Sequence, residues 1–163
     1  MTYHVTDGYI NPQPIADIST TQKVPLGKIV RAYDSSYGEG EFIYLQGVAN
    51  TAVGTWVTYN ADDWSTTLLA SNAIGPVAIA MAACVASRYG WYQISGKAVG
   101  LTSASVADNG NLYCTAASNN GKVDDTDVAG DYIRRAKAAS AVTGAGSIDV
   151  EISRPEVADG LDN

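Results

Sequence analysis

The chain has 163 residues, with 17 acidic and 10 basic side chains and a formal net charge of −7. Proteins that bind nucleic acid use clustered Lys and Arg to contact phosphates, so this charge argues against nucleic acid as a partner. No apolar run reaches 18 residues, and the first residues lack the pattern of a secretory signal. We therefore expect no membrane partner, and a single domain with its own core.

Residues 1–26 contain Pro12, Pro14 and Pro25 among short polar residues. Proline lacks a backbone donor and keeps the preceding residue extended, so we predict an extended N-terminal arm. The arm also carries more apolar side chains than a linker needs: Tyr9, Ile10, Ile15, Ile18 and Val24. Two alternatives follow: the arm lies across its own domain, or it orders against a neighbouring subunit.

The stretch Ile74–Leu101 is predicted to organise the fold. It opens with small and apolar residues, breaks at Arg88-Tyr89-Gly90 and breaks again at Ser95-Gly96. Aromatic and β-branched residues between glycines predict two or three strands folded back on each other. The alternative is a buried helix over Ala78–Ser87, because Ala is the best helix former.

Further strands are predicted on both sides of this stretch, at residues 28–34, 41–46, 54–60, 66–70, 112–116, 132–139 and 147–153. The segment 132–139 also permits a short helix. The segment 147–153 alternates cleanly between apolar and acidic residues, which indicates a half-buried strand that Pro155 should end. About nine or ten short strands predict an all-β fold, with one β-sandwich or barrel over residues 27–154 and an acidic tail over 155–163.

Residues suited to catalysis are few. His4 is the only histidine, and it lies in the N-terminal arm. Gly96-Lys97 lacks the glycine spacing and the following Ser or Thr of a phosphate-binding loop. We predict no enzyme, no cofactor and no metal. Cys84 and Cys114 are interpreted as two free, buried thiols, with a disulfide between neighbouring strands as the alternative.

Two other features could bind a partner or an ion. The acidic run Asp124–Asp131 could gather calcium, but an EF-hand register places Ala129 and Ala136 at positions that need oxygen ligands. We therefore interpret it as a solvated loop, with calcium as the alternative. Tyr37 and Trp64 fall in predicted loops, and both residue types suit protein interfaces.

Two passages, VPLGKIVRAYDSSYGEGEFIYLQGVANTAVGTWVTYN and YGWYQISGKAVGLTSASVADNGNLYCTAASNNGKVDD, resemble small structural proteins of tailed bacteriophages. They are similar to capsid decoration, or cement, proteins, which coat the outside of the head and tie neighbouring capsomers together. The resemblance covers about Val24 to Asp125. It implies a jelly-roll-like domain on the outer surface of the virion capsid, assembled in the host cytoplasm, with the major capsid protein and neighbouring copies of itself as partners.

We therefore expect a non-enzymatic head protein that stabilises the assembled shell. The candidate contacts to capsid or neighbour are Tyr9, Ile10, Pro12, Pro14, Ile15, Ile18, Val24, Tyr37 and Trp64. Deletion of residues 1–24 is expected to remove binding to heads while the β domain still folds. The alternative is a carbohydrate- or receptor-binding β module of a tail fibre, with Trp64 and Tyr37 as an aromatic platform.

Overall fold

The computed structural model describes residues 1–8 and 12–158. Within these residues the fold is all-β, as predicted, and the only helical element is a single 3-10 turn, η1 (Ala117–Asn119). None of the described helices is long and apolar enough to cross a membrane.

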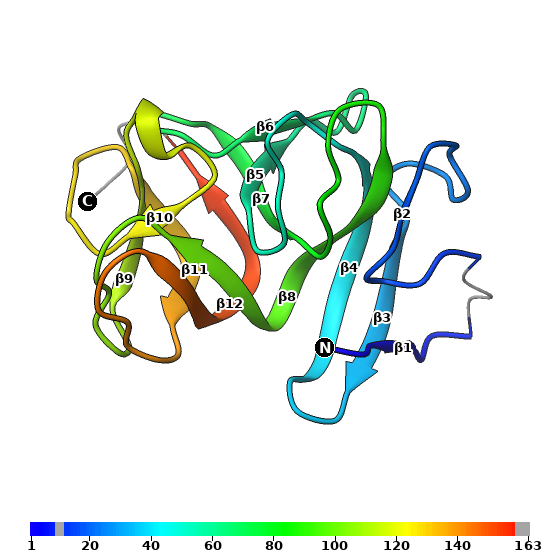
Figure 1. Ribbon diagram of the computed structural model, residues 1–163, viewed down its shortest axis with the longest axis horizontal. Coiled ribbons are helices and arrows are strands. Elements are labelled where there is room, and N and C mark those ends of the chain that lie inside the picture. Colours follow the sequence, from blue (N-terminus) through cyan, green and yellow to red (C-terminus); the bar gives the residue numbers. More distant parts are fainter. Residues whose placement is uncertain (9–11, 159–163) are drawn as a thin grey trace.

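One large sheet contains all twelve strands, in the order β1-β3-β4-β8-β10-β9-β11-β12-β7-β5-β6, with β2 paired to β8 (Figure 1). Their bounds are β1 His4–Val5, β2 Ile18–Ser19, β3 Ile29–Asp34, β4 Gly38–Gln46, β5 Trp56–Tyr59, β6 Thr66–Leu68, β7 Gly75–Ala80, β8 Tyr89–Thr102, β9 Asn111–Cys114, β10 Val123–Asp124, β11 Tyr132–Ala138 and β12 Gly146–Val157. The sequence prediction missed the three two-residue strands β1, β2 and β10, which are too short to show a repeating pattern.

The central stretch forms two strands, β7 and β8, so the strand prediction is confirmed and the Ala-rich helix is wrong. The first part of β8 pairs with β4 and its second part with β12, so this one strand belongs to both halves of the molecule (Figure 1). The expected break at Ser95-Gly96 is wrong as well, because β8 continues through Gly96.

Gly96 lets β8 pass from one partner strand to the next. Its φ is +97°, and the register between β4 and β8 shifts close by, between Glu41 and Phe42. A Cβ at Gly96 would lie 2.3 Å from the carbonyl oxygen of Glu39. Only glycine fits both the backbone angle and the close approach, and the result is a bulge within a continuous strand.

The sheet is buried on both faces along residues 42–45 of β4 and residues 90–94 of β8. Along β4, Phe42 and Tyr44 enter one core cluster while Ile43 and Leu45 enter another, and all four are at most 2% exposed. This double burial explains why residues 42–45 of β4 are continuously apolar and do not alternate with polar residues.

In the other half, the pairings run β8–β10–β9–β11–β12 and return to β8, around an aliphatic core. β12 shows the predicted alternation, with Ile148, Val150 and Ile152 buried. Its predicted end is wrong: the strand runs through Pro155 to Val157. The register irregularity with β11 and the positive φ of Arg154 (+50°) lie where Pro155 has no N–H to donate.

Candidate functional site

The described residues of the N-terminal segment, 1–8 and 12–26, lie across their own domain. β1 pairs with β3, and β2 pairs with the start of β8. Ile15 and Val24 are 3% and 1% exposed and belong to one core cluster with Val30, Ala32, Phe42, Tyr44, Met81 and Trp91. Two of the predicted contact residues, Ile15 and Val24, are therefore buried in the core of this chain.

Gln13 fixes the same segment by polar contacts. It is 2% exposed; its carbonyl oxygen accepts a hydrogen bond from the Trp91 indole (3.0 Å), and its side-chain oxygen accepts one from the Tyr44 hydroxyl (2.7 Å). Its amide nitrogen donates to the carbonyl oxygens of Asp17 (2.9 Å) and Tyr89 (3.1 Å). A buried amide satisfied in this way holds one chain conformation in place, because breaking any of these bonds leaves a buried polar atom unpaired.

The opposite side of the segment is open to solvent. Pro12, Pro14 and Ile18 are exposed, Ile18 to 42%. A shallow hollow of about 350 Å³ lies between β1 and the 14–15 region. We call the exposed side of residues 3–5 and 12–19 the N-terminal face. The predicted contacts Tyr9 and Ile10 lie outside the described residues.

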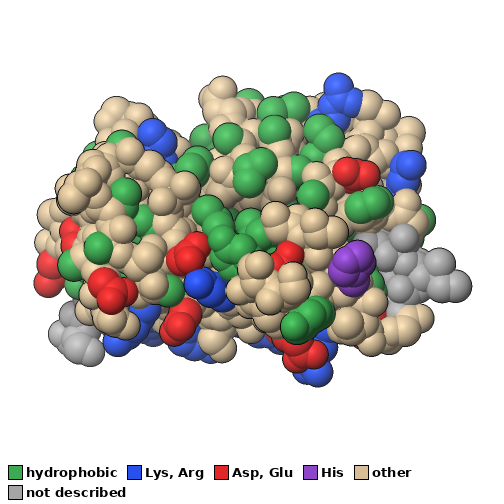
Figure 2. All heavy atoms as spheres, turned by 60° about the horizontal axis from the view of Figure 1, so that its bottom comes forward, with side chains coloured by type: hydrophobic (Ala, Val, Ile, Leu, Met, Phe, Trp, Pro, Cys, Tyr) green, Lys and Arg blue, Asp and Glu red, His purple; other side chains and the backbone are tan. Residues whose placement is uncertain are grey.

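Few charges lie on the N-terminal face. Figure 2 shows this side of the molecule, with the single histidine in purple among hydrophobic and uncharged side chains. Tyr3 is half-buried there, edge-on to the Phe42 ring at 4.7 Å between centroids, and its hydroxyl donates to the carbonyl oxygen of Lys97 (3.2 Å). Burial raises the pKa of Tyr3 to about 12. The face is thus a rigid surface with exposed apolar residues, which suits contact with another protein.

Tyr37 and Trp64, which the alternative hypothesis assigns to an aromatic platform, are both half-buried. The Tyr37 hydroxyl donates to Asp149 (3.3 Å), and the Lys97 ammonium lies 5.4 Å from the centre of its ring. Burial and the neighbouring Asp149 carboxylate raise the pKa of Tyr37. Trp64 is half-buried against a core cluster, and its indole fills the space where a side chain at Gly27 would be.

The acidic loop does not gather its carboxylates around one point. Asp131 is buried and accepts hydrogen bonds from the Ser71 hydroxyl (2.9 Å) and the backbone N–H of Asn72 (2.7 Å). Asp125 accepts from the backbone N–H of Ala107 (2.9 Å). No group of three or more His, Cys, Asp or Glu that could hold a metal occurs among the described residues.

The remaining candidates for chemistry are isolated. His4 is exposed on the N-terminal face. Cys84 and Cys114 form no disulfide and are buried in two different core clusters, so the disulfide alternative is wrong. Burial raises the pKa of the Cys84 thiol, so less of the nucleophilic thiolate forms at neutral pH.

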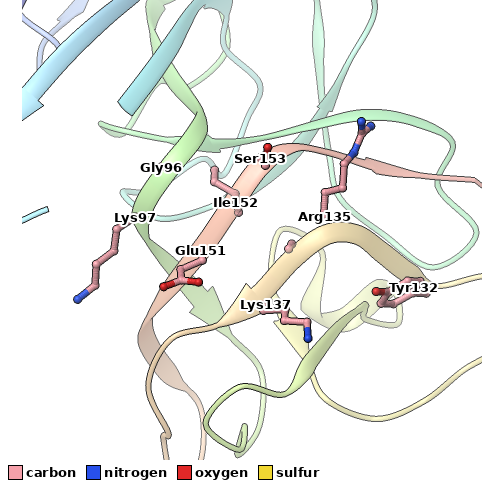
Figure 3. A pocket seen from close by; sticks show the side chains of 9 residues that line it. Gly96, Lys97, Tyr132, Arg135, Lys137, Glu151, Ile152 and Ser153 are labelled. Atoms are coloured by element: carbon pink, nitrogen blue, oxygen red, sulfur yellow. The ribbon is translucent and has the colours of Figure 1, made fainter. Parts of the chain in front are cut away.

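A second hollow was not expected from the sequence. It measures about 520 Å³ and lies where β8, β11 and β12 meet (Figure 3). Lys97 is on its rim and forms an ion pair with Asp149 (2.9 Å). The hollow depends on the irregular pairing between β11 and β12, which has no signature in the sequence.

Comparison with known proteins does not name a family for this fold and surface. No family model, no curated protein and no solved structure matches the chain.

Proposed function

We propose that this chain is a structural head protein of a tailed bacteriophage that binds the outside of the assembled major capsid protein shell and stabilises it. The observation that carries the proposal is the N-terminal face. Buried Gln13, Ile15 and Val24 hold the segment on the sheet, while Pro12, Pro14 and Ile18 face solvent. A rigid apolar surface binds with little loss of conformational entropy, and many copies on a shell add avidity.

Two further points support it. The strand-and-glycine passages between Val24 and Asp125 resemble decoration proteins. The net charge of −7 also suits an outer surface better than one that faces packaged DNA. We further propose that the fold is a β-sandwich or barrel, which the closed series of pairings among β8, β10, β9, β11 and β12 supports. The jelly-roll-like arrangement stays a prediction.

The test is co-sedimentation of the purified protein with purified heads that lack it. Ile18→Asp places a charge on the N-terminal face without touching the core, so we expect at least tenfold weaker binding and an unchanged melting temperature. Val53→Asp is the matched control, because Val53 is 52% exposed in a loop outside the N-terminal face. Equal binding by the Ile18→Asp variant and the wild type would overturn the role of the N-terminal face. Failure of the wild type to bind any head would overturn the proposed function.

A further inference from the structure

The hollow between β8, β11 and β12 has an apolar floor and a basic rim. Gly96, Ala136 and Ile152 form the floor. Lys97, Arg135 and Lys137 lie around it together with Glu151 and Tyr132, as Figure 3 shows. Its volume of about 520 Å³ falls within the range in which proteins bind ligands or partner side chains.

The hollow exists because the sheet is irregular at this point. The register between β11 and β12 shifts between Arg134 and Ala136. Seven non-glycine residues in the described part of the chain have positive φ, and of these only Arg135 (+58°) and Arg154 (+50°) lie inside strands, β11 and β12. Positive φ at a non-glycine strand residue costs energy, on the order of 1 kcal/mol, and such strain concentrates at functional sites.

Basic residues concentrate around the hollow in an otherwise acidic protein. Five of the ten Lys and Arg line it or adjoin a lining residue in sequence: Lys97, Arg134, Arg135, Lys137 and Arg154. Ion pairs link three of them to carboxylates at 2.9–3.0 Å, Lys97 to Asp149, Arg135 to Glu156 and Arg154 to Glu41. Within the described part of the chain, the Lys137 ammonium forms no such pair, although Glu151 lies opposite it on β12. The rim therefore has a cation left to meet an incoming carboxylate.

The acidic loop between β10 and β11 has the complementary chemistry. At its tip, Asp127, Val128 and Ala129 are all exposed, and Val128 is one of the few large apolar side chains on the surface, at 46% exposure. An Asp beside a Val matches a hollow that has a free cation at its rim and an aliphatic floor. The two surfaces belong to the same chain, so a second copy brings the matching partner.

We propose that the 127–129 tip of one copy docks into the hollow of a neighbouring copy, with the Asp127 carboxylate against Lys137 and the Val128 side chain over Ile152. The inference rests on the proposed function, in which neighbouring copies meet on the shell, and names the contact between them. Because tip and hollow are different surfaces, the contact is head-to-tail. Such contacts close into rings when the rotation between copies allows it and otherwise form chains.

The experiment is sedimentation analysis of the full chain at 5–500 µM protein, at low and high salt. We expect reversible self-association that weakens as salt rises, because screening reduces the attraction between the charged groups. Lys137→Glu and Asp127→Lys should each weaken association about tenfold or more. A 1:1 mixture of the two variants should associate again, since each kind of tip then finds an opposite charge in the other's hollow.

Lys23→Glu is the control for the charge change, because Lys23 is exposed and outside both surfaces. It should associate like the wild type, and circular dichroism melting should show that all variants are folded. A wild type that stays monomeric over the whole range would overturn the inference. So would a mixture that behaves like its two components, or a Lys23→Glu variant as weak as Lys137→Glu. The binding of the wild type to heads is measured separately, so the two proposals can fail independently.

Discussion

The two halves of the sheet are stabilised in different ways. The half formed by β3, β4 and the start of β8 is aromatic, with Phe42, Tyr44, Trp91 and Tyr92 buried, and it needs the N-terminal segment to cover one of its faces. The half formed by the end of β8 and β9–β12 has a largely aliphatic core, to which Trp56 of β5 and Val77 and Ile79 of β7 also contribute. The comparison teaches that the N-terminal segment, which has the composition of an arm, can contribute core residues to one half of the sheet and none to the core of the other.

Deletion of residues 1–24 should have the largest effect. It removes Ile15 and Val24, each contributing roughly 1.5–3 kcal/mol by burial, and exposes Phe42, Tyr44 and Trp91 to water. We therefore expect loss of cooperative unfolding or aggregation, measured by thermal melting. This reverses the expectation from the sequence that the β domain folds without the segment. A truncated protein that melts like the wild type would show that the two halves do not differ in this way.

Gly96→Ala tests the junction between the halves. The new Cβ would meet the Glu39 carbonyl at 2.3 Å, on top of the cost of a positive φ. Gly144→Ala is the matched control, because Gly144 has a similar φ of +87° and no atom within 4 Å of a new Cβ. We expect the control to lose about 1 kcal/mol and Gly96→Ala clearly more, measured by denaturant unfolding. Equal losses of unfolding free energy would mean that only the positive φ, and not the close contact with Glu39, makes the substitution at Gly96 costly.

Gln13→Ala should cost about 1–3 kcal/mol, because it leaves the buried Tyr44 hydroxyl without its 2.7 Å acceptor. Tyr44→Phe added to Gln13→Ala should cost less than the sum of the two single changes, since both remove the same hydrogen bond. The measurement is a double-mutant cycle by urea unfolding. Additive losses would show that Gln13 holds the segment through its other contacts.

Tyr3 should give the smallest effect, and only at alkaline pH. Its pKa is raised to about 12 in the folded protein, against about 10 in the unfolded chain, so folding favours the protonated phenol. The resulting stability is complete below pH 10 and is lost as pH rises toward 12. Melting temperatures between pH 8 and 11 should fall less for Tyr3→Phe than for the wild type. Parallel curves would contradict this.

Many of the strands could be predicted because each has a recognisable local sequence pattern. The alternation of Ile148, Val150 and Ile152 located β12, and the aromatic and β-branched run around Trp91 located β8. The covering of the N-terminal half was left open, because Ile15 and Val24 look the same in sequence whether they meet their own sheet or a neighbour's. The predicted contact residues differ in exposure: Pro12, Pro14 and Ile18 are exposed, whereas Ile15 and Val24 are buried.

By itself, the sequence determined the all-β class, most strand positions and the acidic surface, because these follow from the period-two pattern, turn residues and composition. Only the tertiary structure decided that Ile15 and Val24 complete a core, that Gly96 joins two halves within one strand, and that Arg135 borders a hollow. Each of these depends on pairing between segments far apart in the chain. Such pairing is fixed by packing over the whole sheet, and local sequence does not encode it.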